Sequence, residues 1–358
     1  MMSYSARILS AYEKKVSLYE ILSEKISALL EGLIQDEGLY VHSIYHRVKQ
    51  RDSLTRKLNK PDASYKKLGD LTDIAGVRVI TYFSSDVDRV ADIIRREFTV
   101  DTEHSIDKGA LLDPDRFGYL SLHYVVSLGK SHTKFPQDKQ LASLKAEIQI
   151  RSILQHAWAE IEHDLGYKSK HAIPIHMRRR FSRLSGLLEL ADYEFDGLRT
   201  NLREYSEEVA AAQGIDIPLD KISLTHVIKH GDLVRMLDNE IRNQTGLELV
   251  FEDWFAESLI EKLLFVGISR LSDLEAGLRH RSDVITRFAI EHLKGRTYSR
   301  IHRGVSIYYF CTGLLAESGN EDRLLEYLET FRLGEPANRK RFARGIIEKY
   351  QSAGDPHG

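Results

Sequence analysis

The sequence contains very little cysteine and no long apolar run. Its single cysteine, Cys311, excludes an internal disulfide, fits a reducing compartment and is expected to be a buried, small apolar side chain. No segment approaches the roughly 20 apolar residues of a bilayer span, the nearest being the short run 307–316. The N-terminus lacks the apolar segment and cleavage site of a signal peptide. We therefore expect a soluble, cytoplasmic protein.

Excess charge of one sign is also missing. Lys and Arg total 51 against 53 Asp and Glu, a formal charge of -2, so composition predicts no general attraction to nucleic acid or membranes. Repeats, low-complexity segments and coiled-coil heptads of useful length are not found. The C-terminal histidines lack the paired spacing of a zinc site: His226, His230, His280, His292 and His302. A length of 358 residues predicts two domains.

What the sequence does contain is a set of strand-like segments between Tyr65 and Lys168. Segments 76–83, 120–128 and 146–150 are rich in β-branched and aromatic residues and predict buried strands. Alternate residues of a strand share a face, so Glu147, Gln149 and Arg151 are expected on one face. Three polar groups on one face of a core strand require a polar partner.

Two helical features precede these strands. Apolar residues recur every three or four positions from about 4 to 33, which predicts an amphipathic helix that docks on the sheet. A basic run follows at 45–57, where Lys49, Ser53 and Lys57 fall on one helical face. Two ammonium groups and a hydroxyl suit a triphosphate, and Arg47 offers a flat guanidinium that can stack on a base. The alternative is a solvated charged face.

A pair of carboxylates suggests a metal site. Asp73 precedes the first predicted strand and alone could be a loop acid or a helix cap. Glu147 is its expected partner, and two carboxylates from neighbouring strands can hold Mg²⁺ between them while waters and phosphate oxygens complete the octahedron. Phosphoryl-group chemistry needs a metal of this kind to neutralise phosphate oxygens.

Six short motifs then follow one another in a fixed order. They are Arg-x-Lys at 47–49, Ser-x-x-x-Lys at 53–57, Asp-Ile-x-Gly-x-Arg at 73–78, Gly-Tyr-x-Ser-x-His at 118–123, Glu-Ile-Gln-Ile-Arg at 147–151 and Glu-His-x-x-x-Tyr-Lys at 162–168. Together they resemble the RelA/SpoT synthetase domain, the family of alarmone synthetases, over roughly residues 40–170. The resemblance implies an α+β fold with a nucleotidyltransferase-like mixed β-sheet flanked by helices.

The resemblance also implies an activity and a set of site residues. The family transfers the β,γ-pyrophosphoryl group of ATP to the 3′-hydroxyl of a guanosine nucleotide and releases AMP. By similarity, Asp73 and Glu147 bind Mg²⁺, and Glu147 also acts as general base. ATP is expected to be held by Arg47, Lys49, Ser53, Lys57 and Arg78, with the two arginines around the adenine. Acceptor-side positions are Tyr119, His123, Lys108, Gln149 and His163, of which Tyr119 stacks on the base.

One loop departs from the family pattern, so the identity of the acceptor stays undecided. Asp115 and Phe117 stand where many members have lysine and asparagine. The candidate acceptors are GDP, GTP, an adenine nucleotide and tRNA. The dense arginines from Arg178 to Arg183 are either a solvated helix end or a surface that tracks an RNA backbone.

The expected domains are 1–212, a synthetase domain with its N-terminal and trailing helices; 213–220, a linker; and 221–358, an all-α accessory domain of unknown role.

Three functions remain open at this point. The first is a pyrophosphokinase making (p)ppGpp in the stringent response. The second is a toxic relative that pyrophosphorylates the tRNA 3′ end and blocks translation. The third is a non-catalytic nucleotide-binding regulator, and homo-oligomerisation is a further expectation.

Overall fold

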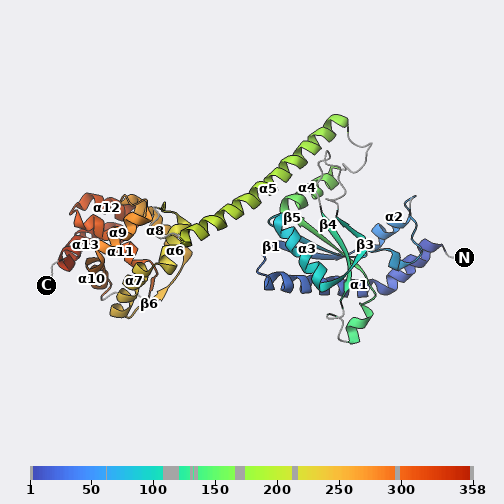
Figure 1. Cartoon of the computed structure of the whole chain (residues 1–358), viewed down its shortest axis with the longest axis horizontal. Helices are drawn as coiled ribbons and strands as arrows, with labels where there is room; N and C mark the ends of the chain where they lie inside the picture. Colours follow the sequence, from blue (N-terminus) through green and yellow to red (C-terminus); the bar gives the residue numbers. More distant parts are fainter. Residues whose placement is uncertain are drawn as a thin grey trace. The chain divides into compact units, whose positions relative to one another are not determined.

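A computed structural model of the chain describes residues 3–61, 63–107, 121–129, 132, 136–165, 174–211, 217–294 and 299–354 (Figure 1). The chain divides into two compact units, Met1–Thr200 and Asn201–Gly358. The division falls inside one long helix, α5 (Ile175–Ala211), so this helix contributes residues to both units. The domain limits expected from the sequence, with a linker at 213–220, stay a prediction. Within that stretch, the Leu219 N–H donates to the carbonyl of Ser269 at 2.9 Å.

The first unit is built on a mixed five-stranded sheet in the order β1-β2-β5-β4-β3. The strands are β1 (Val41–Val48), β2 (Ala75–Thr81), β3 (Phe98–Asp107), β4 (Leu122–Leu128) and β5 (Ala146–Ser152). Strands β2 and β5 run parallel, whereas the other pairs are antiparallel. The predicted α+β class with a mixed sheet is therefore confirmed. The three predicted strands are present as β2, β4 and β5, and β1 and β3 are additional.

Helices flank this sheet in the first unit (Figure 1). They are α1 (Tyr4–Asp36), α2 (Arg51–Leu58), α3 (Ser85–Glu97), α4 (Ile153–Asp164) and the first part of α5, with short 3-10 turns η1 (Leu68–Asp70) and η3 (Pro136–Gln140). The apolar stripe of α1 packs on β1 and β2, and its Leu22, Ile26 and Leu30 are fully buried. The predicted N-terminal helix is thus present and extends three residues beyond 33, to Asp36.

The second unit is helical, as predicted. Its helices are α6 (Lys221–His230), α7 (Asp232–Thr245), α8 (Asp253–Phe265), α9 (Leu271–His280), α10 (Ser282–Leu293), α11 (Val305–Glu317), α12 (Glu321–Thr330) and α13 (Arg339–Gly354), with a 3-10 turn η4 (Pro336–Asn338). The expectation of a purely α domain needs one correction. Two short strands, β6 (Glu248–Val250) and β7 (Arg300–His302), pair in parallel. Three residues are too few to give a strand a detectable period of two in the sequence.

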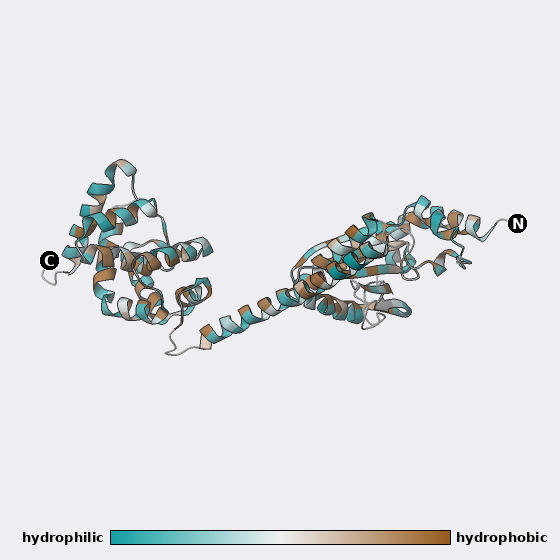
Figure 2. Ribbon diagram, turned by 90° about the horizontal axis from the view of Figure 1, so that it is seen from above, coloured by the Kyte–Doolittle hydropathy of each residue, from teal (hydrophilic) through white to brown (hydrophobic). Residues whose placement is uncertain are grey.

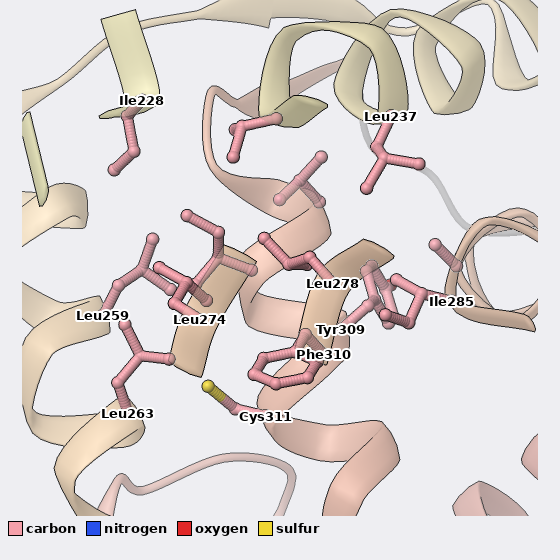
Figure 3. Packing of buried hydrophobic residues seen from close by; sticks show 14 of the residues in the cluster. Ile228, Leu237, Leu259, Leu263, Leu274, Leu278, Ile285, Tyr309, Phe310 and Cys311 are labelled. Atoms are coloured by element: carbon pink, nitrogen blue, oxygen red, sulfur yellow. The ribbon is translucent and has the colours of Figure 1, made fainter. Parts of the chain in front are cut away.

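The core of the second unit gathers residues from several of its helices. Figure 3 shows Leu259, Leu274, Leu278 and Phe310 around Cys311. Cys311 is fully buried, as predicted, and burial raises the pKa of its thiol. A thiol held in its neutral form in this core is a packing group rather than a nucleophile.

Many apolar side chains of helix α5 are exposed to solvent. Figure 2 shows apolar residues recurring along it. The exposed ones include Leu184, Leu187, Leu190, Tyr193, Phe195, Leu198 and Leu202. In the part of the chain that the structure describes, no helix is long and apolar enough to cross a membrane.

Candidate active site

A cavity of about 580 Å³ opens on the first unit where β1, β2 and β5 meet the start of α2. We call it the sheet cavity. Seven residues that the sequence singled out line it: Arg47, Lys49, Ser53, Asp73, Arg78, Glu147 and Gln149. They come from three separate stretches of the chain, 47–53, 73–78 and 147–149, so the fold gathers in one place side chains that lie up to about 100 positions apart.

The register of the sheet explains this convergence. Arg47 on β1 lies opposite Gly76 on β2, and Gly76 lies opposite Glu147 on β5. Gly76 has no side chain, and a Cβ added there would come within 3.7 Å of Arg47 Cγ. The side chain of Arg47 therefore packs over this glycine, on the strand that neighbours Glu147. One step along the same face, Arg78 lies opposite Gln149.

Asp73 occupies the centre of an ion-pair cluster. Its Oδ2 lies 2.7 Å from Nζ of Lys49 and 2.7 Å from Nζ of Lys57. Burial alone would raise the pKa of Asp73, but the hydrogen bonds and charges of the two lysines outweigh it and lower that pKa. The other carboxylate oxygen, Oδ1, is buried and has no hydrogen-bond partner among the described residues. Asp73 is thus ionised at neutral pH and keeps one oxygen free to accept a ligand.

Glu147 is held by two neighbours on the sheet. Its Oε1 lies 3.2 Å from Nδ1 of His123, and its Oε2 accepts a hydrogen bond from the Gln149 amide at 2.8 Å. Burial raises the pKa of Glu147, whereas His123 and Gln149 lower it more, so its pKa falls below the ordinary value. Ser121 Oγ lies 2.7 Å from Nε2 of His123 and orients the ring from its other side. The Glu147 carboxylate is therefore ionised and fixed in place.

The opposite part of the sheet cavity is cationic. Arg78 donates to Glu160 at 2.9 Å, and Arg151 lies close to it with a buried Nε that has no partner among the described residues. Burial lowers the pKa of the Arg151 guanidinium, and the charge of Arg78 lowers it further. His156 experiences the same two effects, so its pKa is also lowered. The three guanidinium groups of Arg47, Arg78 and Arg151 face the carboxylates of Glu160 and Glu147 here, and this excess of positive charge favours an anionic ligand.

Helix α2 supplies a further anion-binding element. Its N-cap is Gln50, whose side chain makes no capping bond, so the first N–H groups are not capped by that side chain. Lys49 lies just before the helix, Ser53 in its first turn and Lys57 in its last turn. The Tyr12 hydroxyl donates to the carbonyl of Lys49 at 2.7 Å and so ties this segment to α1. The backbone and the two ammonium groups together suit a chain of phosphates.

Some of the predicted site residues lie elsewhere. His123 contacts Glu147 but does not line the cavity, and Lys57 reaches it through Asp73. His163 is exposed near the end of α4 and is not among the described residues that line the sheet cavity. Lys108, Tyr119 and the loop 113–117 lie outside the described residues.

The structure adds residues that the sequence reasoning did not assign to the site. Tyr45 and His46 line the cavity from β1, a strand whose pattern was hidden by the basic run. His156 lines it from the first turn of α4, which Ser152 caps directly after β5. Arg151 was expected on the face of Glu147 but was given no role. The spacing of His156 and Glu160, one helical turn apart, was the available signal for this part of the site.

Two carboxylates that line the sheet cavity, Asp73 and Glu147, could hold a metal. Among the described residues, no three His, Cys, Asp or Glu side chains meet in a metal-binding group. Asp73 and Glu147 line the same cavity and are close enough for the charge of Asp73 to raise the pKa of Glu147. Two carboxylates with the remaining positions left to water or phosphate oxygens is the donor set that Mg²⁺ adopts at nucleotides.

Comparison with known proteins gives a consistent result. Residues 46–172 match the family model described as the region found in RelA / SpoT proteins. The chain is 28% identical to the GTP pyrophosphokinase YjbM of Bacillus subtilis (strain 168) over 200 residues, which cover 55% of this chain and 90% of that protein. It is 28% identical to the GTP pyrophosphokinase YwaC of the same organism over 156 residues, or 43% of this chain and 71% of that protein.

Among solved structures, the small alarmone synthetase 1 from Bacillus subtilis bound to its product pppGpp is 27% identical. It covers 54% of this chain and 99% of its own, with a TM-score of 0.43.

Proposed function

We propose that this chain, in which residues 46–172 form a RelA/SpoT-type synthetase domain, is an ATP-dependent pyrophosphokinase that makes alarmones. It transfers the β,γ-pyrophosphoryl group of ATP to the 3′-hydroxyl of GDP or GTP and releases AMP. The observation that supports the proposal is that the carboxylates Asp73 and Glu147 line one cavity with Lys49, Arg47 and Arg78, and that Asp73 also pairs with Lys57. Similarity to two named GTP pyrophosphokinases supports it.

ATP binds across the width of the sheet cavity. Arg47 and Arg78 present guanidinium planes to the adenine. Arg151 adds positive charge close to Arg78, and the imidazole of His156, whose lowered pKa keeps it neutral, lines the same part of the cavity. Lys49, Ser53 and Lys57 bind the phosphates near the start of α2. When phosphates arrive, the two lysines exchange part of their interaction with Asp73 for phosphate oxygens. This exchange frees the Asp73 carboxylate.

Asp73 and Glu147 are the residues that hold a divalent metal, for which Mg²⁺ is our proposal. The buried Oδ1 of Asp73, which has no hydrogen-bond partner among the described residues, fits this role. When bound, such a metal neutralises charge on the phosphate oxygens.

Glu147 acts as general base toward the 3′-hydroxyl of the acceptor. Its lowered pKa keeps it ionised at neutral pH, and His123 and Gln149 hold its two oxygens in fixed directions. A ribose hydroxyl is a poor nucleophile, so a positioned carboxylate that accepts its proton lowers the barrier, and alignment of the reacting groups supplies much of the rest. Tyr119, Lys108, Gln149 and His163 remain the proposed acceptor-side residues.

The test is to incubate the purified protein with γ-labelled ATP, Mg²⁺ and, in separate reactions, GDP, GTP or deacylated tRNA, and to follow the label by chromatography. We expect label on GDP or GTP. Label on tRNA alone would contradict the proposed acceptor, and the absence of any transfer would contradict the proposed reaction.

A further inference from the structure

A second cavity, of about 570 Å³, lies wholly within the helical unit. We call it the helical cavity. Residues of α8, α10, β7, α11 and α13 line it, and six of them carry rings: Phe255, His292, His302, Tyr308, Tyr309 and Phe342. Its volume falls in the range of sites that bind small molecules and cofactors.

The rings provide flat apolar surfaces. Phe255 and His302 stack with their centroids 4.8 Å apart and an interplanar angle of 28°. The ring of His292 packs edge-on against Tyr309 and Phe342, at centroid distances of 5.6 and 5.7 Å. Surfaces of this kind favour a planar ring, which can stack on one aromatic group and meet the edge of another.

One polar group in this cavity lacks a partner. Nδ1 of His302 is buried and forms no hydrogen bond with any residue that the structure describes. Buried polar groups are normally hydrogen-bonded, because leaving such a group without a partner costs stability. A ligand that bonds this nitrogen would remove that cost.

Basic side chains outnumber acidic ones around the helical cavity. Arg300 lines the helical cavity, and no carboxylate in the described part of the chain forms a salt bridge with it. Arg341 and Lys349 line an adjoining cavity that shares His292, Asn338 and Phe342 with the first. Among the described lining residues the only acid is Glu335, whose carboxylate already accepts a hydrogen bond from Asn338 at 3.0 Å. A ligand with negative charge is therefore favoured over a neutral one.

We propose that the helical unit binds a nucleotide in this cavity, with the base among the rings and the phosphates toward Arg300, Arg341 and Lys349. The ring-lined volume selects a planar heterocycle, His302 supplies a hydrogen bond, and the cations select phosphate. This site is separate from the sheet cavity and goes beyond the proposed reaction, because it gives the helical unit a ligand of its own.

The two tryptophans of the chain allow a direct test. Trp254 lies beside the helical cavity, with its ring 5.0 Å from that of His302, whereas Trp158 lies on α4 in the other unit. In a full-length Trp158→Phe, Glu147→Gln protein, Trp254 is the sole tryptophan and turnover is suppressed. We expect GTP or ATP to change its emission saturably, with a Kd of about 1 mM or tighter, and guanosine or tripolyphosphate to bind at least about tenfold more weakly.

Substitutions test whether the change in Trp254 emission arises from binding in the helical cavity. Arg300→Glu should weaken the response about tenfold or more, and His302→Leu should weaken it about fivefold or more. Arg323→Glu is the matched control, because Arg323 is an exposed arginine of the same unit that does not line the cavity, and its response should be unchanged. Melting curves followed by circular dichroism verify that each variant is folded.

No change in Trp254 emission with GTP or ATP up to about 5 mM would overturn the proposal. An unaltered response in folded Arg300→Glu would overturn it as well, and binding of tripolyphosphate as tight as that of GTP would overturn the role of the rings. None of these outcomes depends on AMP release, so failure here is distinguishable from failure of the proposed pyrophosphokinase activity.

Discussion

Asp73 is the residue on which the sheet cavity depends most, because one of its oxygens pairs with two lysines and the other has no hydrogen-bond partner among the described residues. This arrangement keeps three charges in a half-buried position before ATP binds. It also gives Asp73 a measurable role in stability that is independent of catalysis.

The first prediction concerns the pH dependence of that role. Burial opposes ionisation of Asp73, but its lysine partners lower its pKa below the ordinary 3.8. A carboxyl group whose pKa is lowered on folding stabilises the protein above the unfolded-state pKa, and that contribution is lost as the pH falls through the folded-state pKa. Asp73→Asn should therefore destabilise the protein near pH 7, and its difference from the wild type should shrink below about pH 4.

Urea denaturation of both proteins between about pH 7 and about pH 3 measures this difference. Asp52→Asn is the control, since Asp52 is an exposed acid of α2 with no ion pair among the described residues. A difference between wild type and Asp73→Asn that stays constant with pH would contradict the assignment.

The second prediction concerns Glu147. Glu147→Gln preserves the size of the side chain but removes the base and one metal ligand, so AMP release should fall by about 10²- to 10⁴-fold. Binding of ATP, measured by calorimetry, should weaken far less, because the lysines and arginines of the cavity remain.

Glu103→Gln provides the comparison for Glu147→Gln, because Glu103 is an exposed residue of β3 that does not line the cavity. Its activity should equal that of the wild type. If Glu147→Gln kept more than about one tenth of the activity, Glu147 would not be the general base.

At the scale of the elements, α5 supplies a cap for another helix. The Asp196 carboxylate accepts hydrogen bonds from Ser85 N at 3.0 Å and from the hydroxyls of Ser84 and Ser85 at 2.5 Å. Ser84, the N-cap of α3, makes no side-chain capping bond of its own. An aspartate on α5 therefore does for α3 what an N-cap residue normally does, and adds a negative charge at the positive end of the helix.

The third prediction follows from this contact. Asp196→Ala should lower the free energy of unfolding by about 1–2 kcal/mol, because it removes several hydrogen bonds to an ionised group. Urea denaturation measures the loss. Glu194→Ala changes an exposed acid of the same helix and should have little effect. Equal destabilisation by Asp196→Ala and Glu194→Ala would contradict a stabilising role of the hydrogen bonds between Asp196 and the two serines.

Much of the sheet could be predicted from the sequence, and the missing elements have identifiable reasons. Strands β2 and β5 were found because their apolar and β-branched residues alternate with polar ones at the centre of the sheet. Strand β1 lies at the edge, where Tyr45 and His46 face the cavity and solvent, so its pattern resembles a charged loop. An element whose polar residues serve a site loses the periodicity that would reveal it.

Some residues of the candidate site could likewise be predicted from the sequence, and others could not. The lysines and Asp73 follow one another closely enough in the sequence for their spacing to suggest phosphate binding. The pairing of Asp73 with Glu147 could be proposed only on the assumption that their strands are neighbours, which the parallel register of β2 and β5 bears out. The spacing of His156 and Glu160 placed them on one helical face, but it could not place that face at the site, because the turn at Ser152 directs the start of α4 over the cavity.

At the scale of the whole molecule, two separate cores stabilise the chain. The apolar cluster of the sheet unit and that of the helical unit share no buried residue. Helix α5 contacts the two units at different points: Asp192 accepts a hydrogen bond from Ser152 at 2.6 Å, whereas Val209 belongs to the apolar cluster of the helical unit. Each core is therefore complete without the other.

The fourth prediction is that the two units fold independently. A fragment 1–200 and a fragment 201–358 should each melt cooperatively when followed by circular dichroism. The full chain should show two transitions by calorimetry, each close to that of one fragment. A fragment that is unfolded by itself, or a single transition of the full chain at a temperature unlike either fragment, would contradict this division.

The central claim is the transfer of an intact pyrophosphoryl group, and it is tested most directly by comparing ATP labelled in the α- or the γ-phosphate. With GTP or GDP and Mg²⁺ present, we predict that α-label appears only in AMP, that γ-label appears only in the acceptor, and that the two form in equal amounts. Release of ADP, or of inorganic phosphate without a labelled acceptor, would contradict the assignment of the sheet cavity as a pyrophosphokinase site.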